Sequence, residues 1–542
     1  MSPNHSEPPL SLPAARATAE KLLPAQSDGN EAQTAGRGGV AVLGAKLFFL
    51  VVGFVQQPLL RVAVGLNDFG GLAQALVVAN TVNNVVVASG TQGVSRAVAE
   101  ARGHEEQALR AALEIHVPLA VVVAIAMVAA APVYGRFERA EDVVAPLCVL
   151  AGVALLYGLY APLIGYLNGR SRFGRQALLD VTFAALRTAG LIGFGYTFVK
   201  NGGSGVLGTT VGWVAATAVI VPLAARSTGL GRRSAGVPQP AGLRTRGAYL
   251  AMLGPIAGAQ LCTNVLMQID IALLGRFLSE SALSAGLPAE AQRDVVKQWL
   301  AIYKECQTFA FLPYQLLFSI TLVLFPMVAR ARADGDHVAV RAYIARGARL
   351  AAIFCGLLVG VVVAMPESML SFAYGAADAS RGADVLRTMA LAQAAFAMLG
   401  IASTVLTSLG RERTSALVTL AAVVAVAIGC SIAVPGATFG HAQLLRSTLA
   451  SGLALAATLV VAGALVRAEA GAFVPWWTAA RVALSLTCCV AIGFVMPHVS
   501  RLGTPLVALV VAGGYVAFLV ATREIGQADL VMIKALVSRK KS

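Results

Sequence analysis

Three asparagines stand close together inside a long apolar stretch of the chain. Asn80, Asn83 and Asn84 are spaced i, i+3 and i+4, so a helix would place them on one face. Their amides can both donate and accept hydrogen bonds, which suits sugar hydroxyls. The alternative role is hydrogen bonding between helices. Because polar groups inside hydrocarbon are costly, each asparagine is a candidate binding residue.

Two ionisable residues also lie deep inside apolar stretches. The guanidinium of Arg187 stays charged, and its planar fork suits a diphosphate; an internal ion pair, for instance with Asp180, is the alternative. Asp270 could bind a coupling proton or sodium ion, or it could neutralise Arg276. Both residues are therefore candidates for substrate or ion binding.

Other cations lie nearer the ends of apolar stretches. Lys46, Arg61 and Lys304 could line a polar cavity. Arg446 and Arg481 also lie near the ends of apolar stretches and could do the same. Long cationic side chains also reach out of the hydrocarbon to the membrane surface, so that role stays open for each of them.

The elements that hold these residues are predicted from composition and apolar run length. Hydrophobic residues make up 57% of the 542-residue chain and charged residues 13%, whereas soluble domains carry roughly 25% charged residues. Runs of about 20 apolar residues are long enough to cross a bilayer. We therefore predict an all-α polytopic membrane protein with about fourteen transmembrane helices. The predicted spans are 40–64, 72–97, 111–134, 143–167, 177–199, 205–225, 248–277, 300–329, 350–373, 385–409, 415–435, 440–466, 474–497 and 503–522.

The basic residues predict the orientation. Counted over loops on alternate sides, 27 of the 42 lysines and arginines fall on one side and 10 on the other. Cytoplasmic loops are enriched in Lys and Arg, so both termini are predicted to be cytoplasmic in a multi-pass protein of the bacterial inner membrane. The net charge of +15 is then explained by loops facing anionic lipids, and nucleic acid is not needed to explain it.

Enzyme chemistry finds little support in the sequence. No nucleotide-binding loop, metal-ligand cluster or nucleophile triad is visible, and the seven cysteines are scattered through apolar runs. A membrane polymerase or ligase would usually carry large outer loops, and the longest predicted outer loop, 278–298, contains no histidine. We therefore expect a transporter without a cofactor.

A weak internal repeat divides the chain. Two segments resemble each other: VAEARGHEEQALRAAL (98–113) and VARARADGDHVAVRAYI (328–344). Each begins at the end of a predicted span and leads into a basic turn. Parallel repeats of six helices would place a cavity between two bundles, as in alternating-access transporters. The predicted regions are a disordered tail (1–38), an N-terminal six-helix bundle (39–225), a linker (226–247), a C-terminal six-helix bundle (248–467), helices 13 and 14 (468–525) and a basic tail (526–542).

Three segments resemble polysaccharide flippases of the multidrug/oligosaccharidyl-lipid/polysaccharide exporter superfamily. They are GFVQQPLLRVAVGLNDFGGLAQALVVANTVNNVVVASGTQGVSRAVAE (53–100), QIDIALLGRFLSE (268–280) and YKECQTFAFLPYQLLFSITLVLFPMVARARADGD (303–336). The resemblance implies a V-shaped pair of bundles that moves a polyprenyl-diphosphate-linked glycan to the periplasmic leaflet. The partners that the resemblance implies are this glycan and membrane lipids, with a polysaccharide polymerase and glycosyltransferases as candidate protein partners.

The resemblance leaves the substrate open. The predicted number of spans, fourteen, is similar to that of the lipid II flippase branch. That branch usually has cavity arginines in helices 1 and 2. Here the corresponding positions look like Gln56, Asn83 and Asn84. Their neutral side chains favour an O-antigen or exopolysaccharide repeat unit over lipid II. A multidrug/cation antiporter of the same superfamily is the other alternative, although it would favour acidic and aromatic cavity residues.

Overall fold

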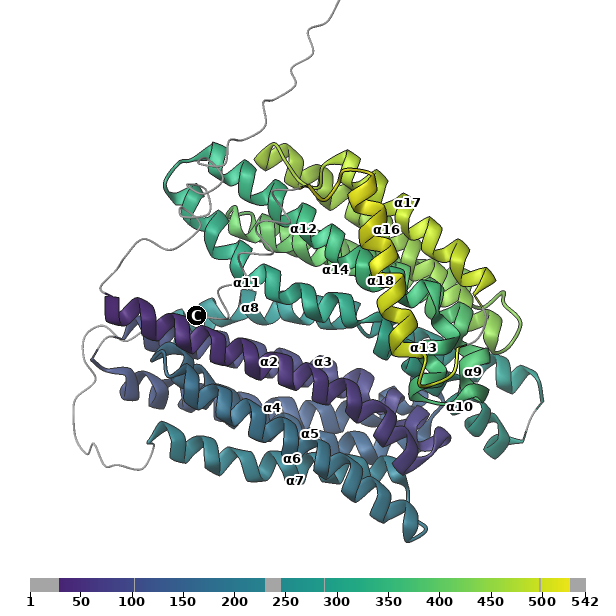
Figure 1. The fold of residues 1–542 in the computed structure, drawn as a ribbon. Coiled ribbons are helices and arrows are strands. Elements are labelled where there is room, and N and C mark those ends of the chain that lie inside the picture. Colours follow the sequence, from purple (N-terminus) through teal and green to yellow (C-terminus); the bar gives the residue numbers. More distant parts are fainter. Residues whose placement is uncertain (1–28, 102, 230–244, 287, 497–498, 527–542) are drawn as a thin grey trace, which may run out of the picture.

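The chain forms two lobes of long helices in a computed structural model that describes residues 29–101, 103–229, 245–286, 288–496 and 499–526 (Figure 1). The regular elements within these ranges are all helical, as the sequence predicted. The C-terminal tail predicted at 526–542 lies almost wholly outside them, as does most of the linker predicted at 226–247.

The described part of the first lobe, from residue 29 to residue 229, contains six long helices. They are α2 (Gly29–Val64), α3 (Leu66–Glu100), α4 (Glu105–Glu138), α5 (Val144–Gly169), α6 (Phe173–Lys200) and α7 (Gly205–Thr228). A short 3-10 turn, η1 (Glu141–Val143), joins α4 to α5. Turn residues separate the apolar runs: Gly65 has φ 85° between α2 and α3, and the Ser204 hydroxyl caps α7 by accepting from the Leu207 amide. The helix α2 begins at Gly29, inside the tail predicted at 1–38, and residues 1–28 lie outside the described ranges.

In the described residues between 245 and 470, the second lobe contains nine helices. They are α8 (Arg246–Leu266), α9 (Ile269–Ser284), α10 (Ala289–Ala310), α11 (Leu312–Ala333), α12 (His337–Ala364), α13 (Pro366–Ala373), α14 (Ala376–Ser408), α15 (Glu412–Ala433) and α16 (His441–Ala470). Two more helices, α17 (Trp476–Val495) and α18 (Thr504–Ala521), follow them and pack beside α12.

Three spans that the sequence predicted as continuous are divided in the structure. The span at 300–329 is interrupted at Phe311, and Pro313 lies in the first turn of α11; the span at 350–373 is interrupted at Met365, directly before Pro366. Proline lacks an amide hydrogen and fits the first turn of a helix, so it favours a new start at both places. The span at 248–277 is interrupted at Met267 and Gln268 without a proline. The prediction of unbroken helices was wrong at these three places.

Thirteen described helices are long and apolar enough to cross a membrane. Many of their large apolar side chains face outward, including Val62 at 80% exposure and Phe494 at 71%. Such a surface would be unstable in water, but it is the expected surface for contact with lipid. The chain is therefore a multi-pass membrane protein.

The internal repeat corresponds to two similar turns. The helix α3 passes into α4 through Gly103, and α11 passes into α12 through Gly335; both glycines have positive φ, at 82° and 71°. The matched valines, Val98 and Val328, are buried at 1% and 0% exposure. The two matched segments therefore each have a buried valine and a turn glycine with positive φ; the repeat itself stays a prediction.

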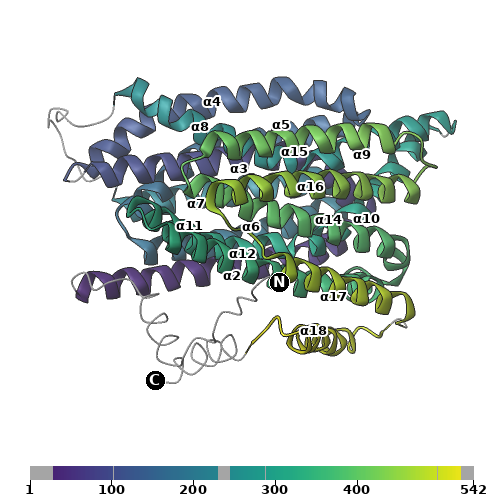
Figure 2. The same ribbon diagram turned by 90° about the horizontal axis from the view of Figure 1, so that it is seen from above.

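The long helices end at two faces, which we call the basic face and the opposite face. Turns at 170–172, 334–336 and 409–411 lie at the basic face, and turns at 139–143, 201–204, 374–375 and 434–440 lie at the opposite face. At the opposite face Leu60, Val64, Phe69 and Leu72 of the first lobe share a small core with Ala301 of α10. Figure 2 shows the same helices from above.

The helices α17 and α18 are fixed to α12 near the basic face. Glu524, just after α18, accepts from Arg349 Nε of α12 at 2.8 Å, from Arg481 Nη1 of α17 at 2.7 Å and from the Thr478 hydroxyl at 2.6 Å. Burial alone would raise the pKa of the Glu524 carboxyl. The three donors together lower it by more, so the pKa lies below its usual range. The carboxylate thus clamps three helices in its charged form.

Candidate functional site

An ionic latch joins the two lobes at the opposite face. Arg61, in the last turn of α2, donates from Nε to Glu305 Oε1 of α10 at 3.0 Å and from Nη2 to Asp378 Oδ2 of α14 at 2.7 Å. Lys297 of α10 forms an ion pair with Asp142 of η1. We call these five residues the latch. Each of its ion pairs crosses from one lobe to the other.

Glycine lets the lobes approach closely beside the latch. A Cβ added to Gly70 of α3 would collide with the backbone carbonyl of Lys297, and one added to Gly275 of α9 would collide with the carboxyl of Glu138. The rings of Phe54 and Phe309 pack edge to face across the same interface, 5.2 Å apart. The opposite face is thus closed by backbone contact as well as by charge.

The helix α8 also contacts the first lobe. Asn84 Nδ2 of α3 donates to Asn264 Oδ1 at 2.8 Å, and the Tyr249 hydroxyl lies 2.8 Å from His116 Nε2 of α4. Of the predicted asparagine stripe, Asn84 therefore takes part in a bond between lobes. The helix–helix role that the sequence left open applies to it in this conformation.

The other two asparagines differ in their surroundings. Asn80 is partly buried, whereas Asn83 has 1% exposure and neither its amide nitrogen nor its amide oxygen has a hydrogen-bond partner among the described residues. An unsatisfied buried amide costs about 1–3 kcal/mol. Asn83 therefore has free hydrogen-bonding capacity.

Arg187 lies within the first lobe, among aromatic rings. Its guanidinium is 4.8 Å from the ring centroid of Phe49 of α2 and 5.8 Å from that of Trp213 of α7. Its buried Nε has no acceptor within the part of the chain that the structure describes. The next residue, Thr188, donates to Gln56 Oε1 at 2.8 Å. Gln56 and Arg187 thus lie near each other, and cation–π contacts stabilise the charge.

Asp270 and Lys304 form a separate group inside the second lobe. The buried Asp270 carboxylate accepts from the Tyr303 hydroxyl at 2.6 Å and from the Ile271 amide at 2.8 Å, while Lys304 Nζ donates to Gln307 Oε1 at 2.8 Å. Arg276 pairs with Glu280, so it is not the partner of Asp270.

The predicted residues therefore lie in four places: the first lobe, the α3–α8 contact, the latch and the second-lobe core. Three candidates lie elsewhere. Arg481 binds Glu524 beside α12, and Arg446 Nη1 of α16 donates to the Ala433 carbonyl of α15 at 3.4 Å. Lys46 is in α2, but its side chain lies outside the described residues. No group of three or more His, Cys, Asp or Glu residues in the described ranges could hold a metal ion.

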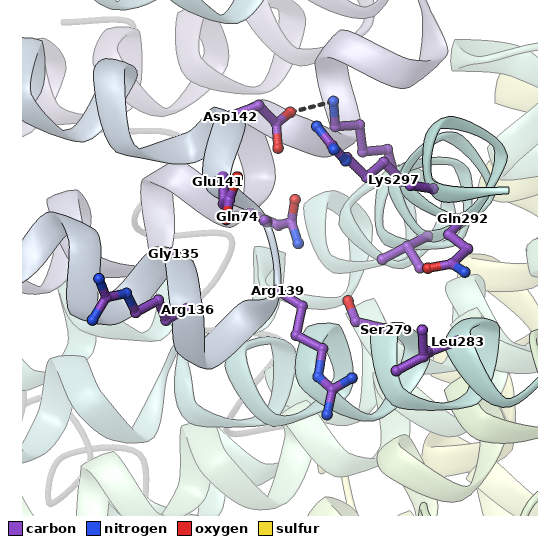
Figure 3. A pocket seen from close by; sticks show the side chains of 14 residues that line it. Gln74, Gly135, Arg136, Arg139, Glu141, Asp142, Ser279, Leu283, Gln292 and Lys297 are labelled. Carbon is purple, nitrogen blue, oxygen red and sulfur yellow. Dashed lines mark ion pairs between the residues drawn. The ribbon is translucent and has the colours of Figure 1, made fainter.

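A cavity of about 360 Å³ lies between the lobes beside the latch. Figure 3 shows the Lys297–Asp142 ion pair on one side of it and Arg139 and Ser279 on the other, with Gln74 between them. Arg136 and Glu141 also line it. Its lining therefore combines apolar residues with charged side chains of both signs.

Sequence reasoning missed the acidic half of this interface. Glu305, Asp378, Asp142 and Glu138 were not selected, because they fall near the ends of predicted spans where charged residues are common. One usable signal was the adjacent pair of charges at Lys304 and Glu305 inside a predicted span.

Comparison with solved structures identifies the fold. The chain superimposes on the lipid II flippase MurJ in an inward closed conformation with a TM-score of 0.68 at 12% identity, covering 90% of this chain and 99% of that one. An inward-facing multidrug resistance MATE family transporter of the MOP superfamily gives 0.57 at 15% identity, with 79% and 98% coverage. A MOP superfamily transporter from Pyrococcus furiosus gives 0.56 at 15% identity, with 79% and 96% coverage.

These similarities show that the chain has the fold of MOP superfamily transporters. No family model matches the sequence, and no curated protein matches it. The match to the lipid II flippase extends over more of this chain than the MATE match does. The finer assignment to polysaccharide flippases rests on the three sequence segments alone.

Proposed function

We propose that this protein moves a lipid-linked oligosaccharide across the bacterial inner membrane by alternating access, with the basic face in the cytoplasm. The observation that carries the proposal is the latch: two lobes of a transporter fold are joined at one face by ion pairs that water could replace when the lobes separate. This arrangement corresponds to a conformation closed toward the periplasm.

The polar groups between and within the lobes support a glycan headgroup. Sugar diphosphates cannot cross hydrocarbon unaided, because their charges and hydroxyls would lose hydration. Asn80, Asn83 and Asn84 supply amides for hydroxyls, and Gln56 and Arg187 supply a donor group and a positive charge for phosphate. Lys46, Arg61 and Lys304 are further candidates, with Asp270 as a candidate coupling residue. The lipid tail would remain in the bilayer.

Charge also supplies a driving force. An inside-negative membrane potential favours export of an anionic headgroup, by about 2.3 kcal/mol for each charge per 100 mV. Exchange of a coupling cation at Asp270 would add to this force.

Lipid II and drug/cation substrates are the alternatives. The fold is compatible with both, because the similar structures include a lipid II flippase and multidrug transporters. The neutral residues Gln56, Asn83 and Asn84 favour a repeat-unit glycan over lipid II. The cationic Arg187 favours an anionic substrate over a cationic drug.

The test is reconstitution into liposomes that contain polyprenyl-diphosphate-linked oligosaccharide, with exposure of the glycan to an added glycan-cleaving enzyme as the readout. We expect flipping of the oligosaccharide lipid, with less flipping of lipid II and no drug efflux. Arg187→Ala should lower flipping at least tenfold, whereas Arg175→Ala, an exposed arginine of the same helix, should not. Full activity of Arg187→Ala would remove that residue from the site, and flipping of lipid II alone would contradict the proposed substrate.

A further inference from the structure

Glu138 is a buried carboxyl at the end of α4 that the proposed transport site does not use. It has 1% exposure. Its Oε2 accepts from Gln74 Nε2 of α3 at 3.1 Å, and its Oε1 accepts from the Tyr134 hydroxyl at 2.9 Å. Both donors are neutral, so the described hydrogen bonds bring no positive charge to this carboxyl.

The second lobe supplies the wall that buries Glu138. Its carboxyl lies directly against Gly275 of α9, where no side chain larger than hydrogen would fit without a shift. Separation of α9 from α4 would therefore expose the carboxyl to water. Glu138 is buried because the lobes are closed at the opposite face.

The charged groups on the surrounding elements are engaged elsewhere or exposed. On α9, Arg276 pairs with Glu280 and stacks on Phe137. On α10 and η1, Lys297 pairs with Asp142. The remaining charges near this end of α4 are exposed to solvent: Arg136, Arg139 and Glu141, together with Arg293 of α10, which lines the cavity described above.

The cavity beside the latch, with its charged lining residues, offers water a route to Glu138. Gln74 lines that cavity and also donates to the Glu138 carboxyl. The second polar atom of the same amide, Oε1, is buried and has no partner among the described residues. Gly135 and Arg139, which lie close to Glu138 in sequence, line the same cavity. The Gln74 side chain therefore connects the cavity with the carboxyl.

We propose that Glu138 is a proton-binding site that controls closure of the opposite face, whatever the cargo. The carboxyl takes a proton from cavity water while the lobes are apart, and the neutral acid is then buried against Gly275 when they close. Burial of an ionised carboxylate with only neutral donors would cost several kcal/mol, and protonation removes that cost. When the face opens, the carboxyl is hydrated and returns the proton to water.

The test is a distance measurement between the lobes as a function of pH. Spin labels on unnatural amino acids at positions 201 and 438, two exposed residues of the opposite face on different lobes, leave the seven cysteines unchanged. In liposomes we expect the open population to rise with pH, with the open-to-closed ratio changing by up to roughly tenfold for each pH unit, as expected for one proton. Glu138→Gln keeps the shape without titrating, so it should stay closed at every pH.

Controls separate this role from a structural one. Glu106→Gln, the same substitution at the exposed far end of α4, should follow the unsubstituted protein. Tyr134→Phe removes one donor to the carboxylate, so its transition should move to higher pH. A pH response in Glu138→Gln equal to that of the unsubstituted protein would overturn the proposal. So would a transition that follows sodium and disappears in choline chloride. The readout needs no substrate, so it stands or fails independently of glycan transport.

Discussion

The Arg61 guanidinium of α2 bridges Glu305 of α10 and Asp378 of α14, with nitrogen–oxygen distances of 3.0 and 2.7 Å. One cation of the first lobe thus pairs with two carboxyl groups of the second. Since Glu305 has 1% exposure, it depends on this partner while the face is closed. Arg61 is therefore the residue whose loss should most directly favour separation of the lobes.

We expect Arg61→Gln to shift the protein toward an open opposite face. Removing one partner of a buried ion pair costs about 3–5 kcal/mol in the state that buries it, which is enough to reverse a modest preference for closure. Spin-label distances at positions 201 and 438 would report the shift. Lys200→Gln, an exposed change at the same face, should have no effect. The exchanged pair Arg61→Asp with Asp378→Arg should restore part of the closure, and an unshifted Arg61→Gln would show that the latch does not hold the lobes.

Gly70→Ala should keep the lobes apart for a steric reason. The new methyl group would meet the Lys297 backbone carbonyl, which cannot rotate away as a side chain could. We expect transport to fall at least tenfold and the distance between the lobes to increase. The matched control is Gly258→Ala in α8, where the added Cβ meets open space. Normal transport by Gly70→Ala would mean that this contact is not required in the cycle.

Asn83→Leu should stabilise the protein while impairing transport. The substitution removes a buried amide without hydrogen-bond partners and keeps a similar volume, so we expect a gain of about 1–2 kcal/mol in the free energy of unfolding. Thermal unfolding in detergent and liposome flipping would measure the two effects. Asn84→Leu breaks the bond to Asn264 and should lack the gain in stability. A variant at position 83 that is less stable and fully active would argue that Asn83 has a structural role only.

Glu524→Gln should loosen α17 and α18 from α12. The clamp depends on the ionised carboxylate, and the pKa of Glu524 is lowered. Its contribution is therefore complete above the pKa of the unfolded chain, near 4.3, and is lost as the pH falls through the lower folded value. At pH 7 we expect a loss on the order of 2 kcal/mol, since two charged hydrogen bonds are weakened. The difference in unfolding free energy between the two proteins should stay constant from pH 7 to about 5 and narrow as the pH falls below about 4. A difference that widens on acidification would contradict this prediction.

The fold could be predicted from the sequence because its main signals are local. Apolar runs and their spacing predicted the helices, and the residues matched between the two segments of the repeat, Val98 and Val328, are both buried. The breaks at Phe311 and Met267 were missed, because transmembrane helices tolerate proline and because Gln268 carries no local breaking signal. Pro313 was visible, but its effect depended on the packing around it.

The candidate site was less predictable, because its contacts join distant parts of the chain. Arg61 was selected as a cavity cation, but its acceptors stand 244 and 317 residues away, so no local pattern could pair them. Asn84 was selected with its helix–helix alternative, and Asn264 lies opposite it in the structure. Glu138 resembled an ordinary loop charge, since the wall that buries it comes from α9.

The charged seam between the lobes has a thermodynamic consequence for the resting protein. When apolar surfaces separate in an aqueous vestibule, the newly exposed area costs free energy in proportion to its size. Carboxylates and guanidinium groups, by contrast, recover most of their lost attraction from solvent and dissolved salt. A seam built around Arg61 and Lys297 therefore keeps the open and closed arrangements of the lobes close in free energy. A small change in free energy is then enough to shift the population from one to the other.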